Sequence, residues 1–290
     1  MGCRIQLAYL NLDKLYDGAY APADYETLDI VSEGCHLYGE ILWPGGSFTA
    51  PRPCVILLHG YPGSAQNGDL GQALRRIGCV VLLPHHRGAW GSEGKYLVSH
   101  CIQDAVNIAE YVRREAFVRR MNIDPDAIFL AGHSMGGNTV LNAGKQLPWL
   151  RGIIAIAPFD PTRFLREGKP EKLRAVLGQG RVLKSDGPDA IYEDIVSHRD
   201  DYGFENAYEE LKDQNLCFVT GSLDECAPPE EMVRPLYELL AAHPTAALQR
   251  WEDLPAAHGL CDCRVEMTRL IAEFIKTLTD RGSGNSVQGA

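Results

Sequence analysis

The chain has 290 residues, 45% of them hydrophobic, and a formal net charge of −10. This length allows one large α/β domain or two small ones, and the hydrophobic share can build a sizeable core. The acidic balance argues against nucleic acid or an anionic membrane surface as the main partner. We expect neither a membrane span nor a secretion signal, because no apolar run is long enough and no basic, apolar leader is present.

The first half of the chain alternates strand-like and helical stretches. Residues 1–24 show no periodicity, and we expect them to wrap the surface or add a small element. Two strand-like runs at 27–31 and 37–43 suit a hairpin. Two continuous apolar runs, 54–58 and 79–83, are typical of strands that are buried on both faces of a parallel sheet.

Helical spacing of apolar residues predicts a helix over 102–112, and a short helix is predicted over 70–77. Residues 122–126 (Asn-Ile-Asp-Pro-Asp) are expected to form a turn before a strand at 127–131. A further apolar strand is predicted at 152–157.

The alternation of strand-like and helical stretches is interrupted from 158 to about 213, where charged residues, Gly and Pro accumulate around short helical patches. We interpret this stretch as an insertion over the sheet. After it we expect, in order, a strand at 215–220, a helix at 229–242, a strand at 246–251 and a last helix with its apolar face at 267–278. This order of elements predicts a mostly parallel sheet of about eight strands with helices on both faces. We expect it to form one domain over 1–280. The tail, 281–290, is expected to be disordered.

One motif stands out at a strand-to-helix junction. Gly132-His133-Ser134-Met135-Gly136 fits the Gly-x-Ser-x-Gly nucleophile elbow. The turn is so sharp that positions two residues from the serine must be nearly free of side chain, and the serine backbone is strained. The Ser134 hydroxyl would then be exposed at a helix N-terminus, where negative charge is favoured.

A serine nucleophile needs a base, because its hydroxyl is hardly ionised near neutral pH. In this architecture the chain order is serine, then Asp or Glu, then His. Asp224 follows a buried strand, and His258 follows the last strand, so both are expected at the carboxyl edge of the sheet. Other acids in these two loops remain open for the same role: Glu225, Glu252 and Asp253.

These motifs make the chain resemble the α/β-hydrolase superfamily over roughly 25–280, with an α/β-hydrolase fold. It is similar to the esterase and prolyl-oligopeptidase-like branches, without the large extra domain of the oligopeptidases. The resemblance implies that Ser134 is the nucleophile, Asp224 the acid and His258 the base.

The same resemblance covers two further loops. His59-Gly60-Tyr61-Pro62 matches the oxyanion loop, which implies that the backbone amides of Tyr61 and Met135 stabilise the oxyanion. The loop at 85–91 resembles Asp-x-Arg-Gly-x-Gly but has His85 in place of the acid, and its Arg87 is expected to organise the loop through an ion pair. The insertion at 158–213 would be a small helical lid.

Four aromatic residues are candidates for the walls of a substrate pocket, although ordinary packing is equally common for such residues: Tyr61, Trp90, Phe159 and Phe164. His133 and His59 are expected to have packing or structural roles. The remaining histidines are expected to be solvated or structural: His36, His85, His86, His100, His198 and His243.

Nine cysteines, an odd number in apolar contexts, predict reduced, buried thiols in a cytoplasmic protein. They are Cys3, Cys35, Cys54, Cys79, Cys101, Cys217, Cys226, Cys261 and Cys263. An alternative interpretation is a metal cluster of His258, Cys261 and Cys263, with Cys226 as a further candidate ligand. Their spacing is too tight and irregular for zinc, and a metal would occupy the proposed base. We expect no metal and no organic cofactor.

We therefore expect a serine hydrolase that cleaves a small-molecule carboxylic ester through an acyl-enzyme. An acyl-peptide or amide hydrolase and a thioesterase use the same triad and stay open. A non-catalytic ligand-binding protein on a hydrolase scaffold is the alternative of a different class. The sequence leaves the substrate and the oligomeric state open.

Overall fold

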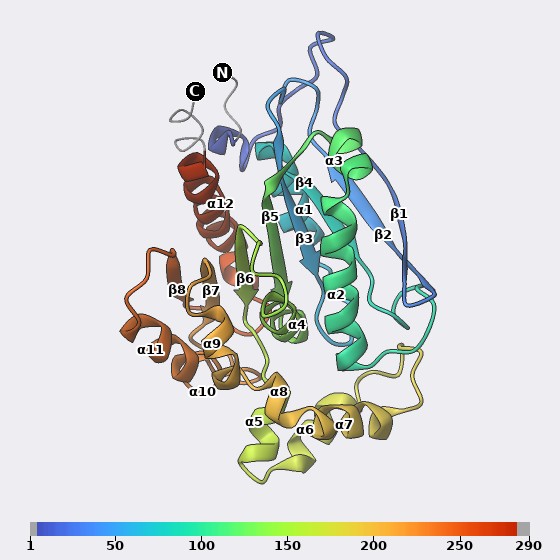
Figure 1. The fold of residues 1–290 in the computed structure, drawn as a ribbon, viewed down its shortest axis with the longest axis vertical. Coiled ribbons are helices and arrows are strands. Elements are labelled where there is room, and N and C mark those ends of the chain that lie inside the picture. Colours follow the sequence, from blue (N-terminus) through green and yellow to red (C-terminus); the bar gives the residue numbers. More distant parts are fainter. Residues whose placement is uncertain (1–4, 283–290) are drawn as a thin grey trace.

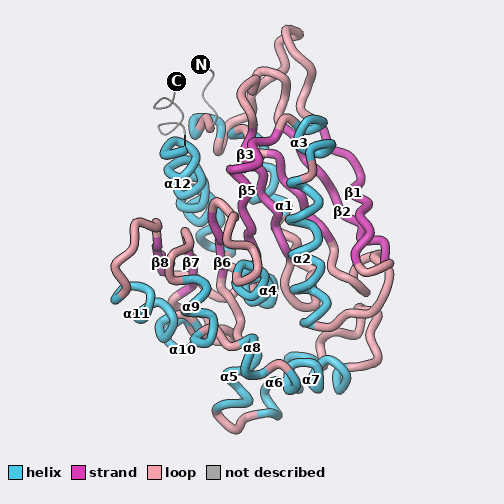
Figure 2. Tube along the Cα trace, in the orientation of Figure 1, coloured by secondary structure: helices cyan, strands magenta, loops and turns pink. Residues whose placement is uncertain are grey.

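A computed structural model describes residues 5–282, apart from the side chain of residue 282, and its centre is one eight-stranded sheet (Figures 1 and 2). The strand order is β1-β2-β4-β3-β5-β6-β7-β8. Pairing is antiparallel in β1–β2 and β2–β4 and parallel throughout the rest. The strands are β1 (Asp24–Ser32), β2 (Cys35–Trp43), β3 (Arg52–Leu58), β4 (Val80–Pro84), β5 (Ile123–His133), β6 (Gly152–Ile156), β7 (Leu216–Gly221) and β8 (Gln249–Leu254). The predicted α/β architecture is confirmed.

Helices cover both faces of the sheet. In the described part of the chain the α-helices are α1 (Gly68–Ile77), α2 (Val98–Arg113), α3 (Glu115–Met121), α4 (Met135–Gly144), α5 (Pro161–Arg166), α6 (Pro170–Leu177), α7 (Pro188–Ser197), α8 (Arg199–Tyr202), α9 (Tyr208–Leu211), α10 (Pro229–Met232), α11 (Arg234–Ala242) and α12 (Arg264–Gly282). Residues 5–282 also contain three short 3-10 helices: η1 (Leu7–Tyr9), η2 (Glu205–Ala207) and η3 (Cys261–Cys263).

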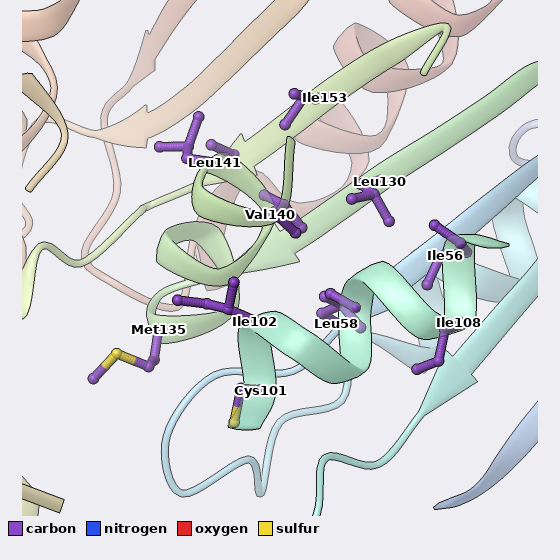
Figure 3. Packing of buried hydrophobic residues seen from close by; sticks show 14 of the residues in the cluster. Ile56, Leu58, Cys101, Ile102, Ile108, Leu130, Met135, Val140, Leu141 and Ile153 are labelled. Carbon is purple, nitrogen blue, oxygen red and sulfur yellow. The ribbon is translucent and has the colours of Figure 1, made fainter. Parts of the chain in front are cut away.

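The core is divided into two layers by the sheet. Alternate residues of a strand point to opposite faces, so that Ile56 and Leu58 of β3 pack under α2 and α4 (Figure 3). Val55 and Leu57 belong to the other layer, under α1 and α12. Both layers are apolar, which explains the continuous apolar runs of the central strands.

The predicted turn at 122–126 is wrong, because β5 already begins at Ile123. Its pairing with β3 joins Arg52 to Ile123 and then Cys54 to Ile128, so the residues between them bulge out of the ladder. The turn chemistry is real, since the Asp126 amide donates to Asp124 Oδ1 at 3.1 Å. These turn-like residues therefore form the bulge within β5.

Two boundaries in the last third also differ from the prediction. The helix expected at 229–242 is divided into α10 and α11 at Val233. Pro235 follows this break, and a proline ring has no N–H to continue a helical ladder. The strand expected at 246–251 is β8, which lies three residues later. The expected disordered tail, 281–290, lies outside the described residues except for its first two residues, which end α12.

The stretch from 158 to 213 forms α5 to α9 between β6 and β7, and α5 to α7 lie below the sheet in Figure 1. Hydrogen bonds join this stretch to the loops after β3 and β4. The Tyr61 hydroxyl donates to Leu177 O at 2.5 Å, and the Lys184 amide donates to Gly88 O at 2.8 Å. The inserted helices therefore cover the carboxyl ends of these strands. Between residues 5 and 282 no helix is long and apolar enough to cross a membrane.

Candidate active site

Ser134 is the junction between β5 and α4, and its backbone is strained. Its φ of 59° and ψ of −120° lie in a region that L-residues rarely adopt. A Cβ on Gly132 would lie 2.2 Å from Gly136 O, and one on Gly136 would lie 2.6 Å from Leu58 O. Both glycines are thus required by close backbone approach, which is the steric reason for the motif.

Three side chains from distant loops meet at this junction. His258 Nε2 lies 2.8 Å from Ser134 Oγ, and His258 Nδ1 lies 2.7 Å from Asp224 Oδ2. Asp224 comes from the loop after β7 and His258 from the loop after β8, and these parallel strands end at the same edge. Asp253, one of the alternative acids, instead accepts a hydrogen bond from Thr220 Oγ1 at 2.7 Å.

The electrostatics of Asp224 fix the tautomer of His258. Burial by itself raises the pKa of Asp224, but the hydrogen bond from His258 and the amides of Ala227 and Cys226 outweigh it and lower that pKa. Asp224 is therefore an acceptor only, which requires His258 Nδ1 to be the donor. The lone pair of Nε2 then faces the Ser134 hydroxyl, as a general base requires.

The loop of His258 is held from two sides. His133, the residue before the serine, donates from Nε2 to His258 O at 2.9 Å. Arg264 donates from Nη1 to Gly259 O at 3.4 Å. Burial, followed by the proximity of His258, lowers the pKa of His133 to about 4, so His133 is neutral near pH 7.

The loop after β3 lies directly against the elbow. A Cβ on Gly60 would lie 2.9 Å from both His133 O and Ser134 Cβ, so Gly60 leaves no room for a side chain. Tyr61 follows Gly60, and its amide lies in this loop. Met135 is the first residue of α4, where an amide has no partner within the helix. The role of these two amides as oxyanion donors stays a prediction.

The four aromatic candidates have different surroundings. The Tyr61 ring packs edge-on against Tyr96, with a centroid distance of 5.4 Å. Trp90 is partly exposed and donates from Nε1 to Pro62 O at 3.2 Å, which joins two loops of the site. Phe159 is buried against Phe164 and belongs to the core. Trp90 is thus the most exposed of the four, and Phe159 has a packing role.

Arg87 forms the predicted ion pair, which confirms its part in organising the loop. Its Nε lies 2.7 Å from Asp104 Oδ1, and the side chains are 7% and 0% exposed. Asp104 also accepts from Ser32 Oγ and from the Arg87 amide. Sequence reasoning missed Asp104, because an acid within an amphipathic helix normally faces water. His86, in the same loop, is buried.

The described cysteines differ in exposure, and Cys35 and Cys263 are half-buried. Cys54, Cys79, Cys101 and Cys217 are buried as predicted, whereas Cys226 and Cys261 are exposed, which corrects the expectation for these two. They lie in the loops that carry Asp224 and His258, and such loops reach the surface. Cys3 lies outside the described residues. Within residues 5–282, no group of three or more His, Cys, Asp or Glu side chains could hold a metal ion.

Comparisons with known proteins find hydrolases that are similar to parts of this chain. The family model described as serine aminopeptidase, S33 matches residues 49–177. A Bacillus subtilis protein named "Putative esterase YitV" is 25% identical over 198 residues, which cover 66% of this chain and 75% of that protein.

Solved esterase structures have a similar fold. The Pyrococcus furiosus esterase Pf2001 has a TM-score of 0.64 and 19% identity, with 88% of this chain and 91% of that chain covered. Est1E from Butyrivibrio proteoclasticus has a TM-score of 0.62 and 16% identity, with 88% and 99% covered.

Proposed function

We propose that the chain is a member of the α/β-hydrolase superfamily and that it cleaves carboxylic esters through an acyl-enzyme. Ser134 is the nucleophile, His258 the base and Asp224 the acid that orients it. The observation that carries the proposal is the unbroken hydrogen-bonded chain from Asp224 through His258 to Ser134, at 2.7 and 2.8 Å. A ligand-binding protein would have no need of this alignment.

In the acylation half of the reaction, Ser134 Oγ attacks the ester carbonyl carbon while its proton passes to His258 Nε2. The carbonyl electron pair moves to oxygen, and the amides of Tyr61 and Met135 stabilise the resulting oxyanion. The tetrahedral intermediate collapses, the bond to the alcohol oxygen breaks, and the alcohol leaves with the proton from His258.

In the deacylation half, water attacks the acyl carbon and gives its proton to His258 Nε2. A second tetrahedral intermediate forms, and the amides of Tyr61 and Met135 stabilise its oxyanion. When it collapses, the bond to Ser134 Oγ breaks, Ser134 recovers its proton from His258, and the carboxylic acid leaves. Asp224 keeps the imidazole in the required tautomer and stabilises the imidazolium in both halves.

The helices of the 158–213 insertion would act as a lid within this single domain, and would shape the acyl or alcohol pocket. The hydrogen bond from Tyr61 to Leu177 supports this proposal, because it links the oxyanion loop to the end of α6. The substrate is a small-molecule ester. The free thiols support a cytoplasmic location.

The serine aminopeptidase match keeps amide cleavage as a second candidate, and a thioesterase would use the same triad. Initial rates on nitrophenyl esters, aminoacyl anilides and acyl thioesters separate the three. We expect the esters to turn over fastest, and Ser134→Ala to abolish that turnover. Faster turnover of the anilides or thioesters would assign the alternative activity, and no turnover of any substrate would favour the binding protein.

A further inference from the structure

His59 lies at the end of β3, in the loop that supplies one oxyanion donor, yet its side chain is buried and turned away from water. Its Nδ1 lies 2.8 Å from the carbonyl oxygen of the next residue, Gly60. The His86 amide lies 3.4 Å from its Nε2. Because a carbonyl only accepts and an amide only donates, these two contacts select the neutral tautomer with hydrogen on Nδ1.

The Gly60 carbonyl that His59 holds belongs to the same peptide unit as the Tyr61 amide. This peptide bond is trans, and in a planar trans unit the C=O and N–H point in opposite directions. Fixing the carbonyl toward the imidazole therefore fixes the direction of the Tyr61 N–H. Gly60 itself lies against Ser134, since a Cβ on Gly60 would lie 2.9 Å from Ser134 Cβ, and Tyr61 is the next residue of this loop.

The imidazole has no freedom to turn away. A Cβ on Gly63, whose φ is +88°, would lie 2.2 Å from His59 Nδ1, so the loop folds back onto the ring. On the other side the His86 ring packs edge-on at 4.6 Å, and its Nε2 lies 3.3 Å from His59 O. Burial lowers the pKa of His59 to about 4, which keeps Nδ1–H as a neutral donor near pH 7.

From this geometry we infer that His59 is a positioning residue, whose Nδ1–H holds the Gly60 carbonyl and thereby aims the Tyr61 amide at the oxyanion. The inference rests on the proposed esterase function. His59 touches none of the reacting atoms, so it acts only through the peptide plane. A misdirected donor stabilises the transition state less well and leaves the binding of the substrate in its ground state unaffected.

The test compares His59→Asn with His59→Leu, which have similar branched skeletons and differ in the donor. Asn has an N–H at the δ position and can still hold the Gly60 carbonyl, whereas Leu cannot. We expect His59→Leu to lower kcat by about 10- to 100-fold with KM within about threefold, because losing an oxyanion donor costs up to about a thousandfold. His59→Asn should stay within about fivefold of wild type. Equal losses in both variants, or an unchanged kcat in His59→Leu, would overturn the inference.

A measurement on the wild-type protein covers the case in which a variant fails to fold. The nitrogen-15 spectrum of His59 should show the Nδ1–H tautomer from about pH 8 to pH 5. An Nε2–H tautomer would overturn the inference. Failure of the proposed function is distinct: it would appear as a wild-type enzyme in which a fluorophosphonate does not label Ser134, whatever the tautomer of His59.

Discussion

His133 Nε2 lies 2.9 Å from the main-chain carbonyl oxygen of His258, so the residue before Ser134 holds the loop that carries His258. We expect His133→Phe to lower kcat by about tenfold or more, because a small displacement of a catalytic group has a large effect on rate. The loss of the hydrogen bond should cost about 1 kcal/mol of unfolding free energy.

Steady-state kinetics and urea denaturation measure these two effects of the His133 substitution. His133→Gln is the matched control, since its amide N–H can occupy the position of Nε2, and it should recover most of the rate. Equal kcat values for His133→Phe and wild type would show that the contact does not position the base.

Gly60→Ala should remove activity, because the added methyl group would meet His133 O and Ser134 Cβ at 2.9 Å. Neither neighbour can move without displacing the elbow, so the nucleophile or the oxyanion loop must shift. Gly68→Ala, at the start of α1, has nothing within 4 Å of the new Cβ. It should leave the rate unchanged and keep or raise stability by up to about 1 kcal/mol. Comparable rates for the two variants would contradict the close approach of Gly60 to the site.

Asp104→Asn should destabilise the fold by about 3–5 kcal/mol, because it leaves the buried charge of Arg87 without its partner. Asp186→Asn is the control, since it removes a pair with Lys95 in which both side chains are more than half exposed. Such surface pairs contribute about 0–1 kcal/mol. Urea denaturation at pH 7 compares the two, and similar free energies of unfolding would refute a structural role for the buried pair.

Stability should fall as the pH is lowered from about 6.5 to about 4. His59 and His133 have folded-state pKa values of about 4, mainly because they are buried, whereas unfolded histidine titrates near 6.5. In this window the unfolded chain binds more protons than the folded chain, so acid favours unfolding. Each of the two histidines lowers the free energy of unfolding by up to about 3 kcal/mol at the acid end of this window, and neither lowers it above pH 7.

Denaturation of wild type and His133→Gln at pH 7 and pH 4.5 tests this linkage. The variant lacks one of the two groups, so its loss of unfolding free energy between the two pH values should be smaller. An identical loss in both proteins would show that His133 does not titrate with a depressed pKa.

Local patterns predicted much of this fold. The apolar runs of β3 and β4 and the apolar face of α2 each follow from spacing that burial imposes on short segments. The bulge in β5 was missed because Asp124 and Pro125 are typical of a turn, and only the pairing with β3 keeps them in a strand. The division between α10 and α11 required attention to Pro235 within an otherwise helical pattern.

The triad candidates were accessible from sequence because each follows a strand at one edge of a parallel sheet. The supporting contacts were not. Asp104 pairs with Arg87 across 17 residues, and His133 reaches a carbonyl 125 residues away. Such contacts depend on how loops pack against each other, and no local periodicity of the sequence predicts them.

Covalent labelling tests the central claim most directly. Wild type and Ser134→Ala are incubated with a fluorophosphonate, and the modified peptide is located by mass spectrometry. The account predicts a single adduct on Ser134 in the wild type and no adduct in the variant. Equal labelling of both proteins, or an adduct on another residue, would contradict it.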